Sequence, residues 1–213
     1  MNFDDFCKQL IKIKKLPLPG HESHYKMEPA VRRKWRENER FEDRKPKEAA
    51  VMALFYPNSS NETQLLLILR KTYQGVHSNQ IGFPGGKVEK EDRELIHTAL
   101  RETYEEVGVL ENDVEVVKKL TQVYIPPSNF LVQSYIGFYP KPKPFKIQEE
   151  EVEALVEVKL TDFLNNNNKI EQQLSTSYAK DILVPAFKLN GYTVWGATAM
   201  MLNEIKDLLN KVL

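Results

Sequence analysis

Three glutamates that lie close together carry the clearest chemical potential in this sequence: Glu102, Glu105 and Glu106. On a helix expected over residues 92–107, a turn of ~100° per residue projects all three carboxylates from one patch. Like charges four positions apart on a helix repel each other by a few tenths of a kcal/mol. A divalent cation would remove this conflict, because hard cations such as Mg²⁺ prefer oxygen ligands. A solvated acidic surface explains the same pattern, so charge alone leaves both interpretations open.

The residues around these acids are compatible with a metal site, although a Gly-Gly pair is usually just a turn. The pair Gly85-Gly86 precedes the helix, and glycines let a loop bring backbone groups close to a metal. Arg101 stands four positions before Glu105 and can pair with it along the helix. The helix is expected to bury a face opposite the carboxylates, made of Ile96, Leu100, Thr103 and Val107.

Strand-like segments surround this helix on both sides in the sequence. Residues 49–57 and 64–70 are apolar and predict a hairpin, because "NSSNET" between them is rich in turn formers. Further strands are expected within residues 114–126, 130–140, 151–160 and 181–195, the last folded around the turn Asn190-Gly191. Thr161 is the expected N-cap of a short helix, and residues 196–213 predict a terminal amphipathic helix. This order indicates an α/β fold with a mixed sheet and helices packed on it.

The N-terminal part is expected to be an appendage of one core. Residues 3–14 predict a short amphipathic helix, and "LPLPG" must end it. The charged segment 32–47 is either a solvated border of the core or a basic rim that receives a substrate phosphate. We therefore divide the chain into an N-terminal helix with a charged extension, residues 1–47, and a main domain, residues 48–213.

The composition of the chain limits the classes of function that it is expected to have. Lys and Arg together number 30 and Asp and Glu together number 30, so the formal net charge is +0 and gives no argument for nucleic-acid or membrane binding. The single cysteine, Cys7, excludes an intramolecular disulfide, and neither a signal peptide nor a membrane-spanning apolar run is visible. A cytoplasmic protein is the expectation.

The order and spacing of the acids resemble a known motif. "GGKVEKEDRELIHTALRETYEEVGV" is similar to the Nudix box, in which a glycine and a glutamate precede Arg-Glu-aliphatic-x-Glu-Glu-x-Gly. The second half matches from Arg101 to Gly108, with Thr103 in place of the aliphatic residue. In the first half Asp92 replaces the glutamate, and eight residues instead of seven separate it from Arg101. The resemblance implies a Nudix-type α/β/α sandwich in which the catalytic helix follows the Gly-Gly loop.

The longer box resembles the subgroup of Nudix hydrolases that cleave coenzyme A. The upstream signature of that subgroup is matched in "RKTYQGVHSNQIGFPGG" by Arg70, His77, Gln80 and residues 83–86. Gln74-Gly75 replace a Leu-Arg pair, and Asn79 replaces a glycine. "WGATAMML" from Trp195 is similar to the start of the last helix in that subgroup. Trp195 and Tyr124 are expected to be core or pocket wall.

The resemblance also implies roles for the acidic residues. Glu105 and Glu106 would be the main ligands of Mg²⁺ or Mn²⁺, with Glu102 and the carbonyl of Gly86 nearby. Glu102 would serve as ligand or as base, and Arg101 would orient the glutamates.

Two further sets of residues are expected at the site: an acid from a loop, and residues that bind the substrate. A loop acid would assist catalysis; Glu151 is the leading candidate, and the alternatives are Glu149, Glu150 and Glu153. Arg70, His77 and Gln80 would bind substrate, and Arg70 suits phosphate because a guanidinium donates two parallel hydrogen bonds.

Three functions remain to be distinguished. The first is metal-dependent hydrolysis of coenzyme A or acyl-CoA to 3′,5′-ADP and 4′-phosphopantetheine or its acyl form. The second keeps this chemistry but acts on ADP-ribose, NADH, dinucleoside polyphosphates or (d)NTPs, because the Leu-Arg pair is missing. The third is a non-catalytic nucleotide-binding module, which the retained carboxylates argue against. A homodimer is expected because dimers are widespread in this fold.

Overall fold

The computed structural model describes residues 1–30, 32–33, 44–72, 79–175 and 181–213. Its main sheet has eight strands among these residues: β1 (Lys47–Pro57), β2 (Thr63–Arg70), β3 (Ile81–Gly82), β4 (Gly85–Lys87), β5 (Glu115–Lys119), β6 (Val123–Ile125), β7 (Phe130–Phe138) and β8 (Val152–Lys159). A second sheet contains β9 (Lys169–Leu174), β10 (Ile182–Leu189) and β11 (Tyr192–Trp195). The described helices are α1 (Phe3–Leu10), α2 (His21–Tyr25), α4 (Leu95–Val107), α5 (Leu160–Leu164) and α6 (Gly196–Leu209), with short 3₁₀ turns at Ile11–Lys15, Glu111–Asp113 and Asn166–Asn168.

The main sheet is mixed and has β1 at its centre. Strand β1 pairs antiparallel with β2 and β4 and parallel with β7, and β8 lies beyond β2. The predicted hairpin of β1 and β2 is confirmed, as is the hairpin of β10 and β11 around Asn190-Gly191. Strand β9 was not predicted, because its alternating partly exposed residues lack the apolar run of a buried strand.

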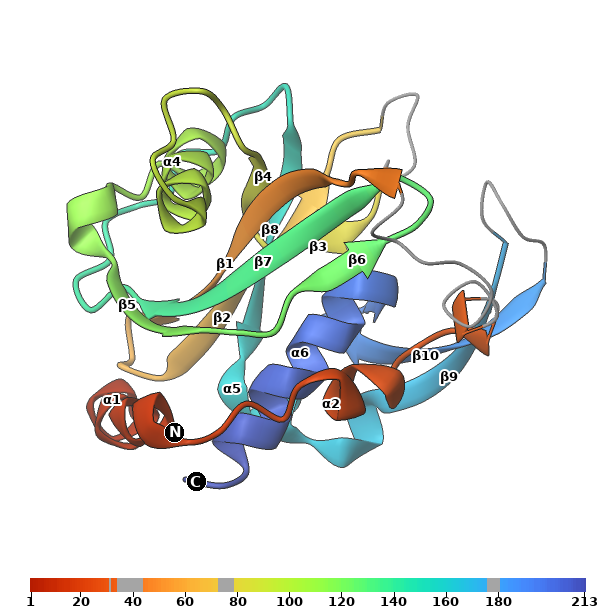
Figure 1. Cartoon of the computed structure of the whole chain (residues 1–213). Helices are drawn as coiled ribbons and strands as arrows, with labels where there is room; N and C mark the ends of the chain where they lie inside the picture. Colours follow the sequence, from red (N-terminus) through yellow and green to blue (C-terminus); the bar gives the residue numbers. More distant parts are fainter. Residues whose placement is uncertain (31, 34–43, 73–78, 176–180) are drawn as a thin grey trace.

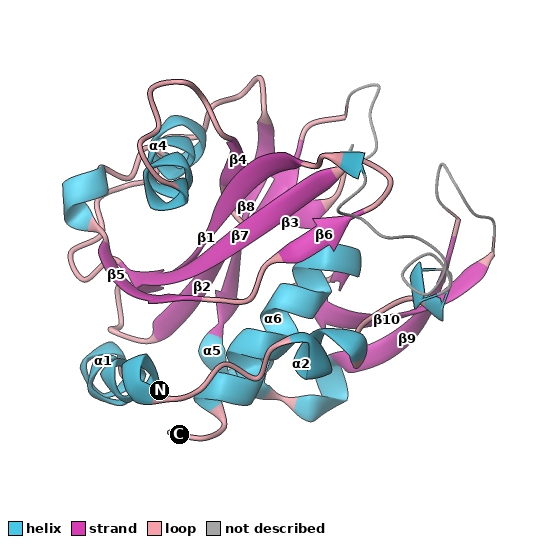
Figure 2. Cartoon of the chain, in the orientation of Figure 1, coloured by secondary structure: helices cyan, strands magenta, loops and turns pink. Residues whose placement is uncertain are grey.

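Strand β1 is buried on both faces of the sheet, which explains its continuous apolar sequence. The side chains of Ala49, Val51, Ala53 and Phe55 enter one hydrophobic cluster, together with α6. Those of Ala50, Met52, Leu54 and Tyr56 enter a second cluster, together with α4. Because side chains alternate along a strand, one central strand supports both layers of an α/β/α sandwich. Figures 1 and 2 show α4 and α6 on opposite sides of the sheet.

The N-terminal helix belongs to the same core as α6. Phe3, Phe6 and Leu10 are buried, and the side chain of Asn2 caps the helix by accepting from the N–H groups of Asp4 and Asp5. The helix predicted over residues 3–14 is confirmed as α1 followed by a 3₁₀ turn. The division of the chain at residue 47 stays a prediction, and most of the charged segment 32–47 lies outside the described residues.

One predicted local feature is wrong: helix α5 begins at Leu160 with Lys159 at its N-cap, so Thr161 lies inside the first turn rather than at the cap. The predicted break after the first helix is confirmed, because the 3₁₀ turn ends at Lys15 and Leu16 is extended. The short helix α2, which follows Gly20, was not predicted. The buried side chains of Ser23 and His24 in α2 pack against α6, and this tertiary contact stabilises a helix too short to form alone.

Candidate active site

Two elements bring three carboxylates together at one end of the main sheet. Glu102 and Glu106 project from α4, and Glu151 precedes β8; one oxygen from each lies within 4.8 Å of the others. Glu106 is 1 % exposed, whereas Glu151 is exposed to solvent. The three carboxylates within this distance include that of Glu151 but not that of Glu105. The resemblance to the Nudix box had implied Glu105 and Glu106 as the main metal ligands.

Backbone pairing fixes the position of Glu151. Lys71, directly after β2, donates its N–H to the Glu151 carbonyl at 2.8 Å, and the next residue, Val152, pairs with Arg70 across a bulge. The N–H of Gln148 donates to the carbonyl of Glu106 at 3.0 Å, which ties the same loop to α4. The alternative acid Glu153 forms an ion pair with Lys71 at 2.7 Å, so Glu151 is the member of the acidic run that faces the site.

The Gly-Gly pair begins strand β4 and lies directly against the carboxylates. The N–H of Gly85 donates to Oε2 of Glu106 at 2.7 Å. Gly85 has φ +147°, and a Cβ there would lie 2.4 Å from the carbonyl oxygen of Ala50. A Cβ on Gly86 would lie 2.4 Å from Oε2 of Glu102. Gly85 therefore requires glycine for its conformation and close packing, whereas a side chain at Gly86 would have to displace the Glu102 carboxylate.

Arg70 contacts the buried carboxylate from the opposite side. Its Nη2 donates to the carbonyl oxygen of Gly85 and lies 3.5 Å from Oε1 of Glu106. Its side chain is 24 % exposed and lines the pocket described below. Arg70 therefore stands where it can both neutralise Glu106 and meet a phosphate oxygen.

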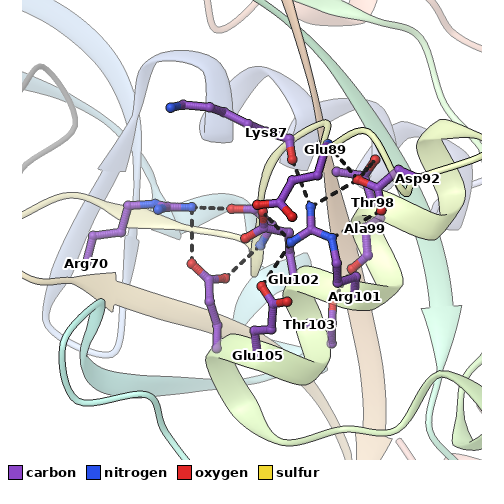
Figure 3. A network of polar contacts seen from close by, with 12 residues as sticks. Arg70, Lys87, Glu89, Asp92, Thr98, Ala99, Arg101, Glu102, Thr103 and Glu105 are labelled. Atoms are coloured by element: carbon purple, nitrogen blue, oxygen red, sulfur yellow. Dashed lines mark hydrogen bonds and ion pairs between the residues drawn. The ribbon is translucent and has the colours of Figure 1, made fainter.

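Arg101 is the centre of a polar network, and Figure 3 shows its guanidinium among Asp92, Glu102, Glu105 and the carbonyl of Lys87. Nε and Nη2 donate to the two oxygens of Asp92 at 3.1 and 3.0 Å. Nη1 donates to Glu102 at 3.1 Å and to Glu105 at 2.9 Å. This geometry supports the predicted orienting role of Arg101, and Asp92 fixes the guanidinium by a bidentate pair.

The buried face of α4 differs from the prediction. Thr98, Ala99, Thr103 and Val107 are buried together with Glu106, while Ile96 and Leu100 are only partly buried. Glu106 lies next to Val107 and three residues after Thr103, so it belongs to the border of the apolar face. Its carboxylate is held there by the Gly85 N–H, which the helical projection could not show.

The pKa values of the acids at this site differ from those of carboxylates on a solvated helix. Burial raises the pKa of Glu106 to about 7, against the opposing effects of Arg70 and the Gly85 N–H. Burial also raises the pKa of Glu102, although Arg101 opposes it. Hydrogen bonds from Arg101 lower the pKa of Asp92 to about 2 despite its burial.

The donor set fits a divalent cation. Oε1 of Glu106 is buried and accepts no hydrogen bond from the described residues. A buried carboxylate oxygen without a donor is costly, and close carboxylates raise each other's pKa values. The Arg70 guanidinium lies 3.5 Å from Oε1. A hard cation among Glu102, Glu106 and Glu151 would coordinate this oxygen and remove the repulsion. Glu105 is half exposed and bonded to Arg101, which places it at the rim.

A pocket of about 470 Å³ opens beside these carboxylates. Glu102, Glu105, Glu151 and Arg70 line one part of it, as do Lys87 and Glu89, which sequence reasoning did not select. Another part of the wall is apolar and includes Phe83, Ile125, Phe130, Trp195 and Met201. Clefts of this size with a few convergent polar groups are typical of small-molecule sites.

The remaining predicted residues have different positions. Gln80 lines the pocket, and His77 lies outside the described residues. Trp195 is pocket wall, as expected, whereas the hydroxyl of Tyr124 donates to Asn129 at 2.9 Å. Pro29 and Arg32 also reach the pocket, and the only sequence signal for them was the charge of the segment that begins at Arg32.

Comparison with known proteins identifies the family. The NUDIX domain model matches residues 46–178, which is more than half of the chain, and the chain therefore belongs to the Nudix hydrolase family, a class of pyrophosphatases. A probable nudix hydrolase of Schizosaccharomyces pombe is 33% identical over 147 residues, covering 68% of this chain and 50% of that protein. The peroxisomal coenzyme A diphosphatase ndx-8 of Caenorhabditis elegans is 30% identical over 156 residues, covering 72% of this chain and 65% of that protein. The chain thus matches less than two thirds of the length of each of these relatives.

Solved structures support the fold. A MutT/nudix family protein from Enterococcus faecalis has a TM-score of 0.52 and 20% identity, covering 93% of this chain and 75% of the other. The resemblance to the Nudix family and the predicted Nudix-type sandwich are both confirmed. Nudix hydrolases generally use divalent metals.

No helix in the described part of the chain is long and apolar enough to cross a bilayer.

Proposed function

We propose that the protein hydrolyses the pyrophosphate bond of coenzyme A or acyl-CoA, giving 3′,5′-ADP and 4′-phosphopantetheine or its acyl form. The observation that carries the hydrolytic part is the cluster of Glu102, Glu106 and Glu151, of which Glu102 and Glu151 line a pocket that also has apolar side chains in its wall. The choice of coenzyme A rests on the longer box, on the upstream signature at Arg70 and Gln80, and on similarity to a protein named coenzyme A diphosphatase.

Mg²⁺ or Mn²⁺ is the proposed cofactor, held by Glu102 and Glu106, with Glu105, the Gly86 carbonyl and, where it does not act as the base, Glu151 as further candidates. When bound, it would neutralise the pyrophosphate oxygens and lower the pKa of a bound water. Within this scheme Gly85 and Arg70 hold Glu106 in place, and Arg101 holds Glu102 against the Gly86 backbone.

Hydrolysis requires one water oxygen to form a bond to phosphorus while the bond to the bridging oxygen breaks. The bridging oxygen leaves with the other phosphate product, and a carboxylate accepts the proton of the water. Glu151 is our candidate for this acceptor, because it is exposed at the pocket and its backbone is fixed by Lys71. Glu102 serves as ligand or as the alternative base. Arg70 lies close enough to the carboxylates to donate to a phosphate oxygen as charge develops.

The partner in this proposal is a nucleoside-diphosphate-linked small molecule, with neither nucleic acid nor a membrane involved. We also propose a cytoplasmic location, as the cysteine content suggests, although the C. elegans relative is named peroxisomal. A homodimer completes the proposal, and light scattering on the purified protein tests it.

A substrate panel tests the function directly. Purified protein with Mg²⁺ or Mn²⁺ is incubated with CoA, acetyl-CoA, ADP-ribose, NADH, a dinucleoside polyphosphate and dGTP, and products are separated by chromatography. We expect CoA compounds to have the highest kcat/KM and to release 3′,5′-ADP. A large preference for ADP-ribose would contradict the substrate assignment, and nucleotide binding without turnover would favour the non-catalytic alternative.

A further inference from the structure

Part of the pocket wall comes from outside the region that matches the NUDIX domain model. That model ends at residue 178 and begins at residue 46. Pro29 and Arg32 reach the pocket from the N-terminal segment, and Gly196 and Met201 reach it from α6. Residues that select a substrate, rather than hydrolyse it, are expected where a chain departs from the shared catalytic domain.

Arg32 is fixed at the pocket by contacts on two sides. Its Nη2 donates to the carbonyl of Tyr124, a residue of β6. Its Nε lies 3.9 Å from Oε1 of Glu28, whose side chain is 1 % exposed. The Arg32 side chain itself is 12 % exposed, so its guanidinium is largely removed from bulk water. Low exposure strengthens the interaction of this guanidinium both with Glu28 and with an anionic group of a ligand in the pocket.

The segment that carries Arg32 is anchored to α6 by a buried polar network. Glu204 in α6 is fully buried and accepts from the N–H of Gly20 at 3.2 Å and from the hydroxyl of Thr121 at 2.6 Å. Nε2 of His24 lies 3.0 Å from the other carboxylate oxygen of Glu204. Figure 1 shows α2 running alongside α6. The segment that leads to Pro29 and Arg32 is therefore anchored to α6 at Gly20 and His24.

The position of Arg32 differs from that of the other arginine at the pocket. Arg70 is committed to Glu106 and the Gly85 carbonyl, beside the carboxylates. Arg32 adjoins the end of β6 next to Ile125, which belongs to the apolar wall. A ligand in this pocket would thus meet two guanidiniums with different protein partners, Arg70 beside the carboxylates and Arg32 beside β6, as well as apolar side chains.

We propose that Arg32 is a specificity residue that binds a second phosphate group of the substrate, separate from the diphosphate that is cleaved. A guanidinium carries five N–H donors in a planar fork that matches phosphate oxygens, and it can hold protein partners and a phosphate together. This inference rests on the proposed function, in which the group is the 3′-phosphate on the ribose of coenzyme A. Arg32 is the first residue of the charged segment 32–47, for which the sequence allowed two interpretations. This role agrees with one of them, a basic rim that receives a substrate phosphate.

The test compares CoA with 3′-dephospho-CoA, which differ only in that phosphate. Arg32→Met is expected to lower kcat/KM for CoA by roughly 10- to 100-fold, the effect of losing a charged hydrogen bond, mainly through KM. The same variant should change kcat/KM for 3′-dephospho-CoA less than about twofold, since no group there meets Arg32. Arg32→Lys should recover part of the loss for CoA. Arg33→Met, at an exposed neighbouring position, is the matched control and should leave both substrates unchanged.

Equal losses for both substrates in Arg32→Met would overturn the inference and assign Arg32 a purely structural place in the wall. Thermal unfolding of each variant separates that result from misfolding. If wild-type protein cleaves neither CoA compound, the proposed function fails by itself. Calorimetric binding of 3′,5′-ADP and 5′-AMP then tests Arg32 independently: tighter binding of 3′,5′-ADP that Arg32→Met abolishes supports the inference, and equal binding of both nucleotides overturns it.

Discussion

The backbone of Gly86 and the carboxylate of Glu102 occupy adjoining space, so that a methyl group on Gly86 would lie 2.4 Å from Oε2 of Glu102. Glu102 cannot retreat freely, because Arg101 donates to its other oxygen at 3.1 Å. Gly86 lies in strand β4 and pairs with Ala50 of β1. It therefore sets the distance between the backbone of this strand and a carboxylate of the candidate metal site.

Gly86→Ala is expected to displace Glu102 and to reduce kcat by at least about 100-fold, as a misplacement of ~1 Å in a catalytic group does. Steady-state kinetics with saturating Mn²⁺ measures the loss, and thermal unfolding shows whether the fold persists. Activity close to wild type would mean that Glu102 has no fixed position in catalysis.

The second prediction concerns the buried carboxylate. Glu106→Gln keeps the side-chain shape but removes a charge that Gly85 and Arg70 hold in place. We expect the stabilisation of the fold by Mn²⁺ to disappear, since ligand binding to the native state raises the melting temperature. Turnover should fall by roughly 1,000-fold.

Two further glutamate variants from the same region serve as a control and as a comparison for Glu106→Gln. Glu111→Gln, in the exposed turn after α4, should preserve both activity and metal stabilisation. Glu105→Gln tests the assignment of ligands: because Glu105 is half exposed and bonded to Arg101, its loss should be smaller than that of Glu106→Gln. A larger loss at Glu105 would restore the original expectation that it is a main ligand.

Sequence reasoning recovered the parts of this site that depend on local spacing. Glu102 and Glu106 are four residues apart on one helix, and Arg101 reaches Glu105 in the next turn, so periodicity alone could relate them. The burial of Glu106 could not be predicted in this way, because it depends on the Gly85 N–H from a strand that packs on α4. The pocket wall at Arg32 was equally hidden, since its placement requires contacts more than 90 residues away in the chain.

The elements of the fold also divide into those that the local sequence predicts and those that depend on tertiary contacts. Strand β1 was predictable from a continuous apolar run, which its burial on both faces explains. Helix α2 was not, because a five-residue helix has no stability of its own and exists through its packing on α6.

The third prediction concerns Asp92, which stands where the family motif has a glutamate. The pKa of Asp92 is held at about 2, below its ordinary value of 3.8, mainly by hydrogen bonds from Arg101. A lowered folded-state pKa contributes stability above the unfolded value, and that contribution is lost as pH falls from about 4 towards 2. Asp92→Asn should therefore reduce the free energy of unfolding by about 1–2 kcal/mol at pH 7.

Urea titrations of wild type and Asp92→Asn at several pH values measure this difference, which should shrink as pH falls below 4. Glu91→Gln, at the exposed neighbouring position, should show no such dependence. A gap of constant size between pH 7 and pH 2 would show that the ionisation of Asp92 makes no contribution.

The last prediction concerns the anchor between α6 and the N-terminal segment. Glu204 is fully buried and only accepts hydrogen bonds, from Gly20, Thr121 and the facing ring of His24. Although burial opposes it, these hydrogen bonds lower the pKa of Glu204, so the carboxylate stabilises the fold above its ordinary pKa and loses this effect in acid.

Glu204→Gln places an amide NH₂ against these donors and should cost about 3 kcal/mol in the free energy of unfolding. Urea unfolding at pH 7 measures it, with Glu22→Gln on the exposed side of α2 as the control. Because the network also anchors the segment that leads to Pro29 and Arg32 at the pocket, the KM for CoA should rise in Glu204→Gln more than kcat falls. An unchanged KM in a destabilised variant would separate the stability of the anchor from the shape of the substrate pocket.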